Sequence, residues 1–89
     1  MFSVYPNPVI YTLVITHGKA RAGAICKLYL TDGKQVFTQA IKQNKTQTLI
    51  EVSRLAYGSY QLTMLNGLEK TIAVIIKQYF YLNLKALSL

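Results

Sequence analysis

The side chains that could carry out chemistry are few and lie far apart along the chain. One histidine, one cysteine, one aspartate and two glutamates occur among 89 residues. General acid–base catalysis needs two titratable groups held close together, and nucleophilic catalysis needs a nucleophile beside a base. The candidates for such roles are His17, Cys26, Asp32, Glu51 and Glu69.

The local sequence gives each of these residues a structural role that requires no catalytic function. Cys26 lies on the apolar face of a predicted strand, where a thiol behaves as a small hydrophobic group. Asp32 and His17 each precede a glycine, as turn residues do. Glu51 falls within a predicted strand, and Glu69 follows a predicted hairpin. We therefore expect no enzyme. A single cysteine and isolated glycines also predict no disulfide, no metal site and no other cofactor.

The elements that position these residues are β-strands, because apolar and polar side chains alternate with a period of two. Asp32-Gly33 and Asn66-Gly67 are hairpin signals, since glycine reaches positive φ without penalty. Pro6 and Pro8 exclude a helix and a central strand near the start, so that segment is expected at an edge, kept from pairing with another sheet. Strands are predicted over 10–16, 24–31, 35–42, 46–52, 59–65 and 69–77.

Six or seven short strands with frequent turns predict an antiparallel sandwich or a small barrel. Each strand should bury one face, and a corner before the sixth run should anchor Leu55, bend at Gly58 and insert Tyr60 into the core. The other side chains predicted to point inward are Cys26, Leu28, Leu30, Ile50, Val52, Leu62 and Met64.

Composition narrows the class of protein further. Hydrophobic residues make up 52% of the chain and charged residues 15%, which excludes intrinsic disorder and predicts one small domain. No apolar run approaches the roughly 20 residues of a transmembrane helix. The start of the chain also lacks the basic segment of a signal peptide.

The net charge of +7 favours an anionic partner, or else only keeps a β-rich chain soluble. Small basic barrels bind single-stranded nucleic acid by stacking bases on exposed aromatic rings. The basic residues here are scattered singly along the sequence, so we expect no nucleic-acid partner. The rings considered for stacking are Tyr5, Tyr11, Tyr29 and Tyr57.

Several sequence elements, taken in order over residues 3–78, resemble the type A C-terminal sorting domain of type IX (Por) secretion cargo. The family reads, loosely, Tyr-Pro-Asn-Pro, then Leu-Tyr-Asp-x-x-Gly-x-x-Val, then Leu-x-x-Gly-x-Tyr, then Ile-Ile-Lys. The matching segments are Val4–Val9, Leu28–Val36, Val52–Leu62 and Ile75–Gln78.

The resemblance implies a seven-stranded antiparallel immunoglobulin-like β-sandwich that sorts an exported protein and catalyses nothing. Such domains pass from the periplasm through an outer-membrane translocon of Gram-negative bacteria to the cell surface or the medium. A surface sortase commonly removes them and anchors the cargo. The residues implied as the sorting motif are Tyr5, Pro6, Asn7, Pro8, Gly33, Leu55, Gly58, Tyr60 and Lys77.

This sequence departs from the family pattern near its end. Ala73 and Val74 stand where a lysine is often found, and an apolar tail of unassigned role, residues 79–89, continues beyond the motif. The N-terminal cargo domain that the family implies is absent from this chain. An exposed edge strand or the tail would allow a dimer. The alternative functions are a structural or adhesive β-sandwich binding module and, after it, a basic single-stranded nucleic-acid-binding β-barrel.

Overall fold

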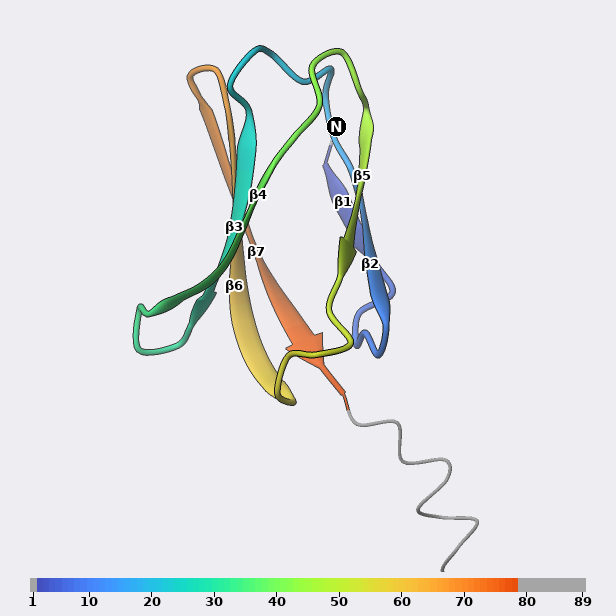
Figure 1. Ribbon diagram of the computed structural model, residues 1–89, viewed down its shortest axis with the longest axis vertical. Helices are drawn as coiled ribbons and strands as arrows, with labels where there is room; N and C mark the ends of the chain where they lie inside the picture. The colour runs from blue at the N-terminus through green and yellow to red at the C-terminus, as the bar shows by residue number, and fades with distance from the viewer. Residues whose placement is uncertain (1, 79–89) are drawn as a thin grey trace, which may run out of the picture.

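The computed structural model describes residues 2–78, which form two antiparallel β-sheets packed face to face (Figure 1). One sheet has the strand order β1-β2-β5 and the other has the order β4-β3-β6-β7. Seven strands and no helix among these residues confirm the all-β, immunoglobulin-like sandwich. The strands are β1 (Ser3–Tyr5), β2 (Thr12–Thr16), β3 (Ile25–Leu30), β4 (Gln35–Ala40), β5 (Gln47–Glu51), β6 (Gly58–Asn66) and β7 (Glu69–Lys77).

The strand positions follow the alternation in the sequence closely. β7 has the predicted bounds, and the ends of the other predicted runs differ from those of the observed strands by at most two residues. The predicted edge position of the first segment is also confirmed, because β1 pairs only with β2 in its sheet. The tail 79–89 lies outside the described residues.

Both predicted hairpins form, but the second is built differently from the expectation. Gly33 turns the β3–β4 hairpin with φ 94°. Asn66 is the last residue of β6 and pairs with Glu69, so the two-residue loop is formed by Gly67 and Leu68. The Asn66 side chain is buried, where its Oδ1 accepts the Arg21 backbone N–H at 2.8 Å. Asn66 therefore ties the hairpin to the loop that precedes β3.

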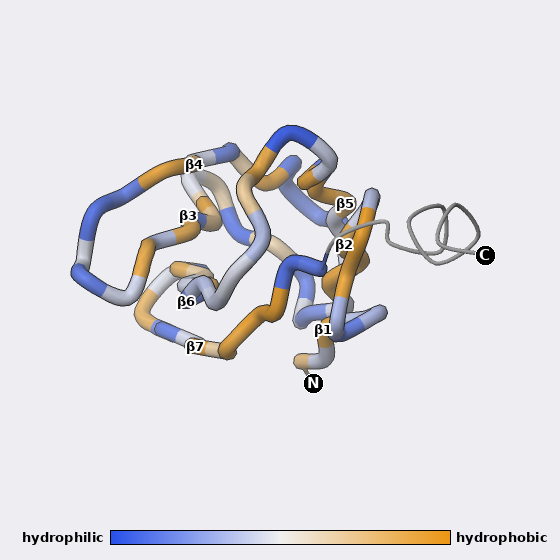
Figure 2. Tube along the Cα trace, turned by 90° about the horizontal axis from the view of Figure 1, so that it is seen from below, coloured by the Kyte–Doolittle hydropathy of each residue, from blue (hydrophilic) through white to orange (hydrophobic). Residues whose placement is uncertain are grey.

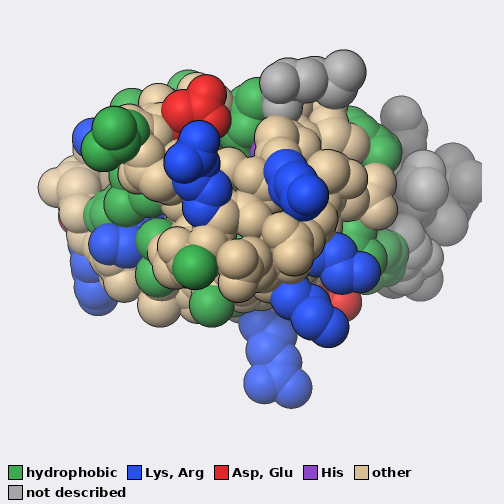
Figure 3. All heavy atoms as spheres, turned by 90° about the horizontal axis from the view of Figure 1, so that it is seen from above, with side chains coloured by type: hydrophobic (Ala, Val, Ile, Leu, Met, Phe, Trp, Pro, Cys, Tyr) green, Lys and Arg blue, Asp and Glu red, His purple; other side chains and the backbone are tan. Residues whose placement is uncertain are grey.

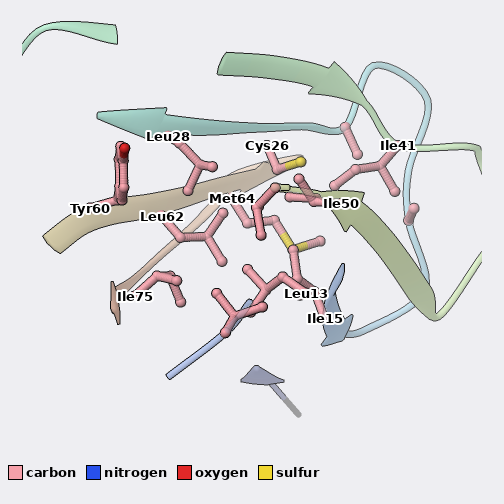
Figure 4. Close-up of a cluster of buried hydrophobic side chains, with 14 residues drawn as sticks. Leu13, Ile15, Cys26, Leu28, Ile41, Ile50, Tyr60, Leu62, Met64 and Ile75 are labelled. Carbon is pink, nitrogen blue, oxygen red and sulfur yellow. The ribbon is translucent and has the colours of Figure 1, made fainter. Parts of the chain in front are cut away.

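The core lies between the sheets and contains the side chains that alternate inward (Figure 4). Ile50, Val52, Leu62 and Met64 are buried as predicted, and Leu30 is partly buried against the core. Deleting a buried leucine or isoleucine side chain from such a core costs roughly 2–5 kcal/mol. The most completely buried large side chains are Leu13, Ile15, Leu28, Ile50, Leu62 and Ile75.

His17 directly follows β2, as expected for a strand-end residue, but it is not a simple turn residue because it is 5% exposed. Its Nδ1 lies 2.7 Å from the Gly18 carbonyl oxygen, which only accepts, so Nδ1 donates. Its Nε2 lies 2.7 Å from the Thr48 hydroxyl of β5. The ring therefore links the end of β2 to its neighbouring strand.

Candidate functional site

Three of the sequence elements that resemble the sorting motif meet at one end of the sandwich. Val9 forms a parallel bridge with Lys77, and Gly58 is the antiparallel partner of Lys77 in the β6–β7 ladder. Figure 1 shows the loop after β1, the turn before β6 and the end of β7 together at the lower end. The fold thus joins segments from the start, the middle and the end of the described chain.

Asn7 makes the principal contact between the first and last of these elements. Its Nδ2 donates to the Val74 carbonyl at 2.9 Å, and its Oδ1 accepts the Ile76 N–H at 2.9 Å. The side-chain amide therefore acts as a peptide group would in a neighbouring strand. The Tyr5–Pro6 and Asn7–Pro8 peptide bonds that flank this residue are both cis.

Val9 extends the same pairing with its backbone. Its N–H donates to the Ile76 carbonyl at 2.8 Å, and its carbonyl accepts the Gln78 N–H at 2.8 Å. Asn7 and Val9 together cover the edge of β7 from Val74 to Gln78. The expectation that prolines keep this segment from pairing with another sheet is therefore wrong within the molecule, because the segment bonds to the edge of the opposite sheet.

The middle element forms a corner around a buried tyrosine. Tyr60 is 4% exposed, and its hydroxyl donates to the Ala56 carbonyl at 2.6 Å. This bond to the backbone a few residues upstream is the tyrosine corner found in immunoglobulin-like sandwiches. Gly58 has φ 138°, a conformation that favours glycine. Leu55 is partly buried against the core, and burial raises the pKa of Tyr60.

Lys77 is not a free surface cation, because it is 8% exposed. Its side chain lies at a hollow of about 440 Å³ at the motif end. The hollow has aromatic and aliphatic walls, which would suit an apolar or aromatic side chain better than a charged one. Its lining residues are Ile10, Tyr11, Ser53, Leu55, Ala56, Tyr57 and Lys77.

The remaining motif residues differ in exposure and position. Tyr5 is 48% exposed, and Pro6, Asn7 and Pro8 are also exposed. Gly33 lies in the β3–β4 hairpin, at a groove on the outer face of the four-stranded sheet, and does not line the hollow. The structure therefore brings most of the predicted motif residues together but not Gly33.

Of the candidate catalytic side chains, His17 and Glu69 line one small hollow of about 120 Å³, and Cys26, Asp32 and Glu51 do not line it. Cys26 is fully buried, burial raises the pKa of its thiol to about 11, and its Sγ donates to the Gln39 carbonyl. Asp32 accepts the Lys34 N–H within its turn, and Glu51 accepts the Ser53 N–H. Residues 2–78 contain no group of three or more histidine, cysteine, aspartate or glutamate side chains that could hold a metal ion. Within the same residues no helix is long and apolar enough to cross a membrane.

Cations gather at the end opposite the motif, which the scattered sequence positions did not indicate. Figure 3 views that end and shows lysine and arginine side chains over much of it. Backbone hydrogen bonds from Ala20 to Lys45 and from Asn44 to Ala20, each 2.8 Å, hold together the two loops that carry most of them. The exposed cations of these loops are Lys19, Arg21, Lys42 and Lys45.

Comparison with known proteins gives one informative result. A family model described as a secretion system C-terminal sorting domain matches residues 3–78. A comparison with curated proteins finds no significant match. The family match covers every strand of the sandwich.

Proposed function

The chain belongs to the C-terminal sorting domain family of the type IX secretion system, and we propose that it serves as the sorting signal of an exported cargo protein. Membership of this family implies contact with the secretion machinery and export through the periplasm to the cell surface or beyond. The family match over residues 3–78 is the observation that carries the proposal.

The geometry supports a role as a folded signal. The elements of the motif are up to about seventy residues apart, yet Asn7 and Val9 bond directly to β7. Losing either element would open the edge of the four-stranded sheet. The motif elements therefore come together only when the sandwich is folded. A receptor that binds this assembled surface would discriminate folded from unfolded domains.

We assign two kinds of role to the motif residues. Some of the exposed residues contact the machinery, whereas the other motif residues shape the surface that it meets. Asn7 and Lys77 join the elements at β7, and the corner residues and the hairpin glycine set the backbone path. The proposed contact residues are Tyr5, Pro6 and Pro8, and the shaping residues also include Gly33, Leu55, Gly58 and Tyr60.

The proposed partners are an outer-membrane translocon, which reads the domain, and a surface sortase, which removes it and anchors the cargo. The cargo would precede residue 3. A cleavage site between cargo and domain would lie upstream of Val4-Tyr5-Pro6. In this scheme the domain is a substrate of the machinery and performs no reaction itself.

A reporter fusion tests the proposal. Residues 1–89 are attached to the C-terminus of a reporter with its own periplasmic signal, in a strain with an intact type IX system and in a translocon-deficient twin. We expect reporter on the surface or in the medium of the first strain only. Retention in the periplasm of both strains would reject the sorting role and favour an adhesive or structural binding module.

Tyr5 allows recognition to be separated from folding within the same assay. Because its ring is 48% exposed, Tyr5→Ala should leave thermal unfolding nearly unchanged. Export should nevertheless decrease if the ring contacts the machinery. The matched control is Leu49→Ala, an exposed apolar side chain on β5 that lies outside the motif segments. Equal export of both variants would remove Tyr5 from the contact surface.

A further inference from the structure

β7 is an edge strand whose edge is only half covered. Asn66 and Glu69 are the hydrogen-bonded pair that closes the β6–β7 hairpin. Because bonded and non-bonded pairs alternate in an antiparallel ladder, the odd-numbered residues of β7 bond to β6. Even-numbered residues therefore present their N–H and carbonyl groups outward, as the bonds of Ile76 to Asn7 and Val9 show. Within residues 2–78, nothing bonds to the outward backbone groups of Ile72 or to the Val74 N–H.

The same stretch exposes apolar side chains on the outer face of the sheet. Ile72 is 51% exposed and Val74 is 61% exposed. Beside them, a groove of about 520 Å³ runs over the outer face and includes Tyr29, Leu65 and Lys70 in its walls. An open row of donors and acceptors next to exposed apolar side chains is the surface that strand addition uses.

The charges on this face are all positive. The strand register places Lys27 and Lys70 on the outer face, and none of the three acidic residues of the chain lines the groove. A net charge of +7 also opposes close association of two copies of the chain. Charge complementarity therefore favours an acidic partner over a second copy.

We propose that the edge of β7 from Lys70 to Val74 binds an extended acidic peptide segment of the secretion machinery by strand addition. The proposal rests on the proposed function and deepens it by locating a docking edge. Outer-face side chains of the added strand would lie beside Ile72 and Val74, with a carboxylate beside Lys70. The motif determines where docking can occur, since Asn7 and Val9 close the rest of the edge.

A synthetic peptide tests the edge directly. The probe is the blocked heptapeptide Val-Thr-Val-Thr-Glu-Thr-Glu, and its control has lysine at both glutamate positions. Amide hydrogen exchange of the full chain is followed with and without peptide. At a peptide concentration ten times the dissociation constant, exchange at Ile72 and Val74 should slow about tenfold. Unchanged exchange, or equal slowing by the lysine peptide, would overturn the proposal.

Two variants separate the backbone edge from its charge. Ile72→Pro removes an outward N–H without removing a bond to β6, and should abolish slowing at Val74. The matched control is Thr38→Pro, at an outward-facing position of the other edge strand β4. Lys70→Glu keeps every backbone bond and should weaken the acidic peptide while favouring the lysine peptide. Retained binding in both β7 variants would overturn the proposal.

The reporter assay distinguishes this proposal from the proposed function. Export of the wild-type fusion together with loss of export in the Ile72→Pro and Lys70→Glu fusions, but not in Thr38→Pro, supports the docking edge. Export of all four fusions would overturn the edge and leave the sorting role intact. Periplasmic retention of the wild-type fusion would reject the sorting role. The peptide experiment alone would then show whether the β7 edge binds an acidic strand. A wild-type dimer lost in Ile72→Pro would assign the edge to a second copy and overturn the acidic partner.

Discussion

Replacing Asn7 with alanine should open the edge of β7 and destabilise the sandwich by a measurable amount. The side chain makes two hydrogen bonds of 2.9 Å to Val74 and Ile76. Each such bond contributes a net 0.5–1.5 kcal/mol or so, and because Asn7 is exposed, water replaces part of the loss. We therefore expect a decrease in the free energy of unfolding of about 1–2 kcal/mol. For a domain of this size, that lowers the Tm by roughly 4–16 °C.

Asn7→Asp tests whether the two bonds act separately. The carboxylate still accepts the Ile76 N–H, but it cannot donate to the Val74 carbonyl and repels that oxygen. Its Tm should fall between those of the wild type and Asn7→Ala. Amide hydrogen exchange at Ile76 should accelerate in Asn7→Ala and remain slow in Asn7→Asp.

The control is Gln43→Ala, in an exposed loop at the opposite end, which should leave the Tm within about 1 °C. If Asn7→Ala also leaves the Tm unchanged, and Ile76 exchanges as slowly as in the wild type, then the contact does not close the edge. The proposed structural role of the first motif element would then be wrong.

Three further predictions concern the buried polar groups. Tyr60→Phe removes the hydrogen bond to the Ala56 carbonyl and should lower the free energy of unfolding, measured by chemical denaturation, by about 1 kcal/mol. A stability equal to that of the wild type would contradict a contribution of this bond. Because the folded pKa of Cys26 is about 11 against an ordinary 9.0, stability should be full below pH 9 and fall by on the order of 2–3 kcal/mol as pH rises to 11. Cys26→Ala should abolish that part of the pH dependence. If the free energy of unfolding changes equally with pH in both proteins, the thiol of Cys26 is not its cause. Thr48→Val leaves Nε2 of His17 without its partner and should cost about 1–3 kcal/mol, measured by thermal unfolding, whereas an unchanged Tm would show that the bond contributes nothing.

Strand positions could be predicted from the sequence because alternation and turn chemistry are local properties. The inward side chains of β3, β5 and β6 follow from a period of two, and Gly33 and Gly67 mark the hairpins. The order and spacing of the motif elements identified the family, and with it the sandwich in place of a barrel. These features can be recognised in the sequence without knowing which strands lie beside each other.

Contacts between distant segments could not be predicted in the same way. The bonds of Asn7 to β7 join residues almost seventy positions apart, and no local pattern distinguishes that side chain from an ordinary turn asparagine. The burial of His17 and Asn66 likewise depends on strands or loops far away in the sequence. The burial of Lys77 was not predicted either, because its charge does not show which face of an edge strand it occupies.

The clustering of cations illustrates the same limit. Lys19, Arg21, Lys42 and Lys45 belong to two separate loops that pair only in the folded chain. Their separation along the sequence argued against a basic patch, whereas backbone hydrogen bonds between the two loops bring them to one end of the sandwich. Figure 3 shows several lysine and arginine side chains at that end. Figure 2, seen from below, shows apolar and polar segments interspersed along the chain. Burial alternates along β2, β3 and β5, so the sequence pattern indicates the faces of the sheets but not which loops meet at their ends.

The most direct test of the central claim is the fraction of a reporter carrying residues 1–89 that lies outside the cell, compared between a strain with the type IX system and its translocon-deficient twin. A sorting domain predicts that most of the reporter is surface-bound or secreted in the first strain and periplasmic in the second. Equal fractions in the two strains would contradict a sorting role for this chain.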